Sequence, residues 1–230
     1  MASPATPNST PAPTATLRSF TLGPFATNSY VVHCGAACWV VDPSFGPGPI
    51  IRFLGSLSLR PEAIVLTHAH VDHIAGVAEV CRAFPGTPVW IHAAEASWLS
   101  DPMLNLSGLS GMSVTSPGPQ GTLTPGGSIS LGPVAFRILH TPGHSPGSVS
   151  LFAQRWPVPG ADAIPIVISG DALFAGSIGR TDFPGSDHET LIRSIREQLY
   201  TLPDETTVYS GHGPPTTIGR EKRNNPYVRG

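Results

Sequence analysis

The stretch that most constrains this chain is THAHVDH, residues 67–73, which directly follows the apolar run AIVL. It places three histidines and an aspartate in one short turn after what reads as a buried strand. Functional sites of α/β folds lie at the carboxyl edge of such strands. Since one zinc ion takes about four ligands, the H-x-H then D-H arrangement is better divided between two ions than crowded around one.

Two ions need more ligands, and three later positions offer them. Each is a histidine or aspartate that directly follows a glycine and an apolar segment, in HTPGH, ISGD and YSGH. Glycine lets a backbone bend sharply and approach a crowded centre. A bridging carboxylate suits the separation of about 3.5–4 Å in two-metal sites. The predicted ligands are His68, His70 and His144 for the first metal, Asp72, His73 and His212 for the second, and Asp171 bridging both.

The remaining histidines have no ligand-type neighbours and read as ordinary core or surface residues: His33, His92, His140 and His188. Asp42, which ends the strand-like CWVVD, has two open interpretations. Its carboxylate could orient a metal ligand, or it could form a simple strand-end turn with Pro43.

Composition excludes several classes of partner. Charged residues make up 12% of the chain and the formal net charge is -2, so no nucleic acid partner is indicated. No apolar run approaches the roughly 20 residues that a membrane span requires. The three cysteines are too few and too irregular for a disulfide framework, which favours reduced thiols and a cytoplasmic location. The oligomeric state stays open.

The order of elements predicts the architecture. Residues 1–16, rich in Pro, Ala, Ser and Thr, are expected to form a flexible tail, and residues 17–230 a single domain. Strands lead and helices follow in each half, which indicates an α/β fold with two mixed sheets packed face to face and helices outside, a four-layer αββα sandwich. Helices are expected over 72–84 and 187–200, and a polar tail after His212. Residues 101–121 form an irregular loop that is a candidate for function.

The ordered motifs THAHVDH, TPGH, SGD and SGH resemble those of the metallo-β-lactamase superfamily over nearly the whole ordered chain. The segments GDALFAGSIGRTDFPGSDHETLIRSI and SGHGPPTTIGREKRNNP are similar to short glyoxalase II-like, hydroxyacylglutathione hydrolase-related enzymes. The resemblance implies the αββα sandwich and two divalent metal ions, usually Zn2+, with Fe or Mn possible.

Two departures from relatives refine this expectation. β-Lactamases of the superfamily do not combine an aspartate at the bridging position with the full H-x-H-x-D-H set, so Asp171 argues against lactam hydrolysis as the main role. Full-length glyoxalase II adds a C-terminal helical region that contacts glutathione, and this chain has no matching positions. Glutathione recognition is therefore not implied.

These observations predict a metal-dependent hydrolase of a small-molecule thioester. A metal-bridging hydroxide would attack the acyl carbonyl, with Asp72 orienting the nucleophile. A thiol of pKa about 8.5 leaves readily, so no strong general acid is required. Substrate selection is expected from residues 101–121 and 177–182. Arg180 could pair with a substrate carboxylate or form a buried ion pair with Asp182 or another acid. Asn105 and Ser107 are candidates to line the pocket.

Two alternatives remain open. A persulfide dioxygenase with one iron would use the facial set of His68, His144 and Asp171, although the GHGPPTTIG ending favours the hydrolase. A non-catalytic metal-binding protein would need a closed site with no position for water. Metal analysis separates one iron per chain from about two zinc-type ions.

Overall fold

Strand pairing in the computed structural model, which describes residues 14–230, produces two six-stranded sheets and a small two-stranded one. In the first sheet, β1, β2 and β3 pair antiparallel and β3 to β6 pair parallel. Its strands are β1 (Ala15–Leu22), β2 (Thr27–Cys34), β3 (Ala37–Val41), β4 (Ala63–Val65), β5 (Val89–Ile91) and β6 (Gly121–Thr122). The sheet is therefore mixed, as predicted.

The second sheet is antiparallel except where β10 and β13 run parallel. Its spatial order is β14-β13-β10-β9-β8-β7. Its strands are β7 (Ser128–Leu131), β8 (Val134–His140), β9 (Val149–Trp156), β10 (Ile164–Gly170), β13 (Thr207–Ser210) and β14 (Thr216–Thr217), and the two-stranded sheet pairs β11 (Leu173–Phe174) with β12 (Ser177–Ile178).

Alternation of side chains along each strand sorts the core into layers, because successive residues point to opposite faces. Between the sheets, Val32 of β2 and Trp39 of β3 pack in one cluster with Phe136 of β8. The rings of Trp39 and Phe136 lie 5.4 Å apart. Val31 and Val40, the neighbours in sequence, point the other way, into the cluster under the helices.

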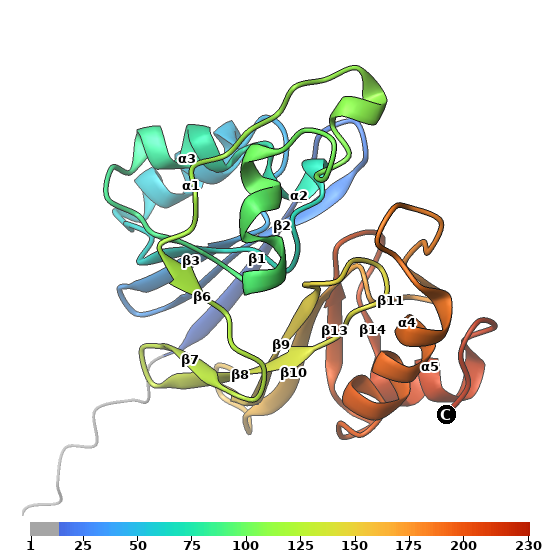
Figure 1. The fold of residues 1–230 in the computed structure, drawn as a ribbon. Helices are drawn as coiled ribbons and strands as arrows, with labels where there is room; N and C mark the ends of the chain where they lie inside the picture. The colour runs from blue at the N-terminus through green and yellow to red at the C-terminus, as the bar shows by residue number, and fades with distance from the viewer. Residues whose placement is uncertain (1–13) are drawn as a thin grey trace, which may run out of the picture.

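Helices cover the outer face of each sheet (Figure 1). α1 (Gly48–Ser56) and α3 (Val77–Ala83) bury Ile50, Leu54 and Val80 against the first sheet. α4 (His188–Ser194), the π-helical turn η3 (Ile195–Leu199) and α5 (Ile218–Asn224) bury apolar side chains against the second. The four-layer αββα sandwich is therefore confirmed. None of the helices within residues 14–230 is both long and apolar enough to cross a membrane.

Several expected boundaries differ from the structure. The helix predicted over 72–84 is divided into α2 (Val71–Ile74) and α3, because the Gly76 N–H donates to the Pro43 carbonyl. The segment predicted as a polar tail after His212 instead contains β14 and α5. The helix predicted over 187–200 ends as η3. β1 starts at Ala15, so residues 15 and 16 of the predicted tail are strand residues, and the first 13 residues of that tail lie outside the described residues.

The carboxyl ends of several strands lie together at one edge of the sandwich, next to the residues predicted to bind metal. β8, β10 and β13 run in the same direction, so their carboxyl ends meet at one edge of the second sheet. The first sheet joins this edge through backbone hydrogen bonds. Val149 N–H donates to the Thr67 carbonyl at 2.9 Å, and Asn28 N–H donates to the Gly211 carbonyl at 2.7 Å. Loops from both sheets therefore face one another here.

Candidate metal centre

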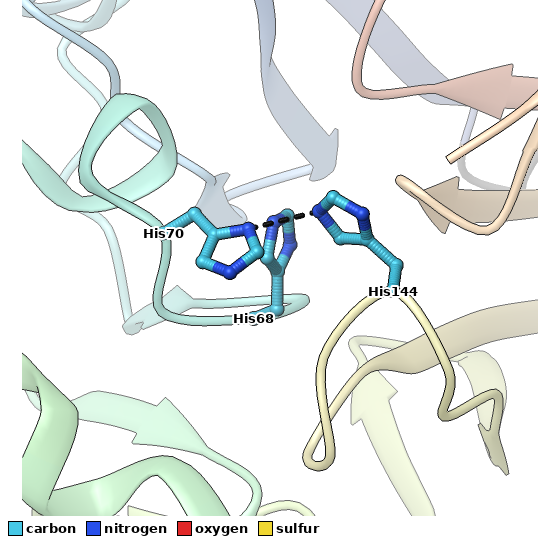
Figure 2. A group of neighbouring side chains, drawn as sticks. All are labelled: His68, His70 and His144. Carbon is cyan, nitrogen blue, oxygen red and sulfur yellow. Dashed lines mark hydrogen bonds between the residues drawn. The ribbon is translucent and has the colours of Figure 1, made fainter. Parts of the chain in front are cut away.

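The loops at this edge bring three histidines together from distant parts of the chain. His68 and His70 lie between β4 and α2, and His144 lies in the loop between β8 and β9 (Figure 2). Nδ1 of His70 lies 2.8 Å from Nε2 of His144. One ring nitrogen from each of the three lies within 4.8 Å of the others, and all three side chains are buried. This is the group predicted for the first metal.

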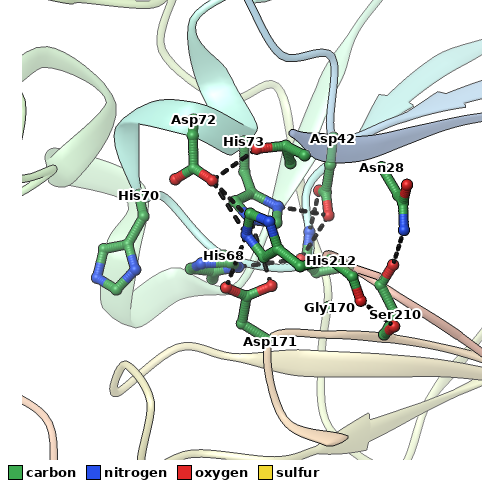
Figure 3. A network of polar contacts seen from close by, with 12 residues as sticks. Asn28, Asp42, His68, His70, Asp72, His73, Gly170, Asp171, Ser210 and His212 are labelled. Carbon is green, nitrogen blue, oxygen red and sulfur yellow. Dashed lines mark hydrogen bonds and ion pairs between the residues drawn. The ribbon is translucent and has the colours of Figure 1, made fainter. Parts of the chain in front are cut away.

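A second group lies beside it. Asp72 and His73 come from α2, and His212 comes from the loop after β13 (Figure 3). Oδ2 of Asp72 lies 3.2 Å from Nε2 of His212 and 3.5 Å from Nε2 of His73. Ligand atoms of these three residues also lie within 4.8 Å of one another. This is the group predicted for the second metal.

Asp171, which directly follows β10, lies between the two groups (Figure 3). Its Oδ1 is 3.4 Å from Nε2 of His73, and its Oδ2 is 3.3 Å from Nε2 of His212. Oδ2 is also 3.6 Å from Nε2 of His144, in the first group. The structure thus brings together all seven side chains that the sequence singled out, with one carboxylate reaching both sets.

The cluster has the unsatisfied atoms that a cation would pair with. Nε2 of His68, Nε2 of His73 and Oδ1 of Asp171 are buried and make no hydrogen bond among the described residues, although the last two atoms lie 3.4 Å apart. A buried polar atom without a partner costs free energy, so such atoms in one cluster call for an explanation. Imidazole nitrogens and carboxylate oxygens are the ligands of zinc and of similar divalent metals. The residues present therefore fit a pair of such ions.

Protonation in the cluster follows burial and charge. Burial lowers the pKa of His70 to about 3, with help from the neighbouring His144, so the ring is neutral and can offer a lone pair. Burial raises the pKa of Asp72, but His73 and His212 outweigh it and hold that pKa at about 2. For His73 burial is likewise outweighed, and the carboxylates of Asp72 and Asp171 raise its pKa well above the usual range. Protons and metal ions thus compete for His73.

Asp42 takes the orienting role that the sequence left open. Its Oδ2 accepts hydrogen bonds from Nδ1 of His73 at 3.0 Å and from Oγ1 of Thr67 at 2.6 Å. A carboxylate accepts only, so Nδ1 of His73 carries the proton and Nε2 is left toward the cluster. The other oxygen, Oδ1, accepts from the Thr67 N–H at 2.7 Å. Asp42 therefore fixes both the loop that begins at Thr67 and the ring of His73.

Two residues that support the cluster were missed from sequence. Oγ1 of Thr27 donates to Oδ2 of Asp72 at 2.7 Å. The fully buried Glu95 accepts from the Ala69 N–H at 2.6 Å and from the Gly147 N–H at 2.7 Å. It thus joins the two loops that carry the first group of histidines. A signal existed for Glu95, since it is the one charged residue in AAEASWLS, the 3-10 helix η1 (Ala93–Ser100).

The glycines before the later predicted ligands have the tight surroundings that the sequence predicted. A Cβ on Gly211 would collide with Oδ1 of Asp171 and would lie 2.7 Å from Cε1 of His73. Gly143 has φ of +126°, and a Cβ there would collide with the backbone of Leu191 in α4. Side chains at either position would displace the ligand-bearing loops.

A pocket of about 370 Å³ opens onto the cluster. The loop of residues 101–121, for which a functional role is predicted, lines it through Leu106, Leu109 and Ser110. Asn105 and Ser107 do not line it. Nδ2 of Asn105 instead donates to the carbonyls of Trp98 and Val114, and its Oδ1 accepts from the Ser107 N–H, so they hold the loop in shape.

Arg180 lines the pocket and pairs with Asp182, with Nη2 to Oδ2 at 2.8 Å. The pair was expected to be buried, but both side chains are 67% exposed. The histidines predicted to be ordinary are outside the ligand groups formed by residues 14–230. Of these, His92 and His140 stack on each other with ring centroids 4.7 Å apart.

Comparison with known proteins places these features in context. Residues 22–212 match the family model described as the metallo-beta-lactamase superfamily. The chain is 42% identical to the "Probable metallo-hydrolase YqgX" of Bacillus subtilis, over 93% of this chain and 97% of that protein. It is 34% identical to "Hydroxyacylglutathione hydrolase GloC" of Haemophilus influenzae, over 82% of this chain and 86% of that protein.

Solved structures agree on the fold. The crystal structure of the BLEG-1 B3 metallo-beta-lactamase superposes with a TM-score of 0.85 at 42% identity, over 94% of this chain and 100% of that one. The structure of TTHA1623 in a di-iron-bound form gives a TM-score of 0.79 at 38% identity, over 92% and 100% of the two chains.

Proposed function

The chain belongs to the metallo-beta-lactamase superfamily, and from that membership we propose that it hydrolyses a small-molecule thioester at a dinuclear metal centre. It is a metallo-hydrolase of this superfamily, with a cluster of histidine and aspartate side chains able to hold divalent metals. Thioester cleavage, the number of ions and the choice of zinc are the parts we propose. The relative named as a hydroxyacylglutathione hydrolase supports the thioester.

The observation that carries the proposal is the position of Asp171. Its two oxygens reach nitrogens of both ligand groups within 3.6 Å. We assign His68, His70 and His144 to one ion, Asp72, His73 and His212 to the other, and Asp171 to both. A bound pair of divalent ions supplies a water of lowered pKa and polarises the acyl carbonyl.

The protein's own groups would orient this chemistry. Thr27 donates to Oδ2 of Asp72, and that carboxylate, with its pKa of about 2, stays ionised and would accept a hydrogen bond that orients the attacking water. Burial lowers the pKa values of His68 and His70, so both rings are neutral and do not act as general acids. The leaving thiolate needs no acid, because a thiol of pKa about 8.5 departs readily as the anion.

Metal analysis combined with a substrate panel tests the proposal. We expect about two metal ions per chain and hydrolysis of S-lactoylglutathione or another thioester, with activity lost on chelation and restored by Zn2+. One iron per chain with oxygen-dependent consumption of a persulfide would favour the dioxygenase. Tightly held metal with no turnover on any member of the panel would favour a non-catalytic metal-binding protein.

Lactam hydrolysis is the second candidate function. The specific observation is the solved structure named as a B3 metallo-beta-lactamase, which is 42% identical to this chain. That likeness weakens the argument from Asp171 against lactams. A chromogenic cephalosporin belongs in the same panel, and a kcat/KM above that of every thioester would replace the proposed function.

A further inference from the structure

The walls of the pocket beside the cluster are apolar. Its lining includes Phe25, Val71, Leu106, Leu109, Phe174 and Phe183. These side chains come from the β1–β2 turn, α2, the loop of residues 101–121, β11 and the segment before α4. The polar groups that line the pocket are mainly the ligand-type side chains of the cluster. A substrate therefore meets apolar walls on its way to the reacting centre.

The rim of the pocket is also apolar and is open to solvent. Phe25 is 46% exposed and Leu109 is 57% exposed, although both line the pocket. In the same loop as Leu109, Met103 is 59% exposed and Leu104 is 40% exposed. Clustered exposed apolar side chains mark surfaces that bind apolar ligands. Phe25 and Leu109 thus extend the apolar surface of the walls out to solvent.

Arg180 is the one arginine or lysine in this lining within residues 14–230, and it is already paired. Nε of Arg180 donates to Oδ1 of Asp182 at 2.9 Å, and Nη2 donates to Oδ2 at 2.8 Å. The guanidinium carbon lies 4.4 Å from the ring centroid of Phe183. Two parallel hydrogen bonds and a ring contact fix the fork of Arg180. A substrate carboxylate that pairs with the same two donors would have to displace Asp182, and at the remaining Nη donors it would still meet the negative charge of Asp182.

Chemistry indicates which half of a thioester suits these walls. The thiol half departs as an anion, which water stabilises better than an apolar wall does. The acyl half stays uncharged up to the carbonyl that is attacked. Its chain is therefore the part that gains most from contact with Phe174, Phe183 and Leu106.

We propose that the enzyme selects thioesters of uncharged, apolar acyl chains and that the Arg180–Asp182 pair discriminates against acyl chains with a terminal carboxylate. This inference rests on the proposed thioesterase function and narrows it.

Four probes test the proposal on the metal-loaded full chain: N-acetylcysteamine thioesters of butanoic, hexanoic and adipic acid, and S-lactoylglutathione. The hexanoyl and adipoyl chains have the same length and differ in a terminal carboxylate. We expect kcat/KM to rise about tenfold from butanoyl to hexanoyl, for two methylene groups buried. The hexanoyl thioester should exceed both the adipoyl thioester and S-lactoylglutathione.

The outcomes separate this inference from the function it rests on. Preference for the adipoyl thioester or for S-lactoylglutathione, with thioesters turned over, overturns the inference and leaves the thioesterase in place. No turnover of any of the four probes overturns both.

The substitution Asp182→Asn tests the ion pair directly. Without the carboxylate, Arg180 can turn to a substrate anion, and the ratio of adipoyl to hexanoyl kcat/KM should rise roughly fivefold. Asp204→Asn is the matched control, since Asp204 is an exposed partner of Lys222 and Arg223 outside the pocket lining. It should leave the ratio unchanged. An unchanged ratio in Asp182→Asn would refute the role given to the pair.

Discussion

Glu95 offers the sharpest test of how this fold holds its proposed metal ligands. Its buried carboxylate accepts the N–H groups of Ala69 and Gly147, one from each loop that carries histidines of the first group. In the substitution Glu95→Gln the shape is kept, but one oxygen becomes an NH2 group. Whichever way the amide turns, a donor then faces one of the two backbone donors. One of the two loops loses its anchor.

The magnitude follows from these bonds. Leaving a buried N–H without an acceptor costs about 1–3 kcal/mol, and the new NH2 group is also buried. Part of this loss is offset by a gain. Burial disfavours the charged form of Glu95 and raises the pKa of its carboxyl, and the uncharged amide of glutamine avoids that cost. We expect a net loss of about 2 kcal/mol in the free energy of unfolding. If the metal-bound state alone lost about 2 kcal/mol, metal affinity would fall about 30-fold.

Two measurements check this expectation. Guanidinium unfolding of the zinc-loaded protein gives the loss in stability, and competition with a chromogenic chelator gives the metal affinity. The control is Glu197→Gln, which removes an exposed carboxylate from η3 and should change stability by less than about 0.5 kcal/mol. If Glu95→Gln matched this control in both unfolding midpoint and zinc affinity, the anchoring role of Glu95 would be wrong.

Other predictions probe the remaining parts of the site. Asp171→Ala removes the carboxylate that reaches both groups, so metal content should fall below one ion per chain and kcat should fall about 10³-fold. Elemental analysis that finds the normal metal content, together with normal turnover in the assay, would exclude a bridging role for Asp171. Gly211→Ala places a Cβ against Asp171 and His73 and should lower metal content, whereas Gly118→Ala, with open space around it, should not. Burial lowers the pKa of His212, but the effect of Asp171 and Asp72 is larger and raises this pKa to about 9. In chelator-treated protein, protonated His212 therefore stabilises the folded state. This stabilisation is complete below about pH 6.5, the usual pKa of histidine, and is lost as pH rises through about 9. Zinc binding at pH 7 should therefore release protons, seen as calorimetric heats that depend on the ionisation enthalpy of the buffer; heats independent of buffer would contradict the raised pKa.

The layered fold was predictable because it depends on local pattern. Alternation in β2 and β3 shows which side chains face each layer, and helical spacing in α1 does the same for its buried face. The boundaries were less predictable. The split between α2 and α3 depends on a hydrogen bond from Gly76 to Pro43, far back in the chain, which no local periodicity reveals. α5 likewise gains its order by packing Ile218 into a distant cluster.

The sequence by itself determined the seven ligand-type side chains, because each lies in a short motif directly after an apolar strand and needs only its own strand end to be placed. Tertiary structure alone decided what surrounds them. Thr27, Asp42 and Glu95 touch the site across separations of 25 to 52 residues. The exposure of the ion pair between Arg180 and Asp182 likewise depended on the position of their segment at the surface of the fold. Such contacts exist only once two sheets are packed face to face, and that packing is a property of the whole chain.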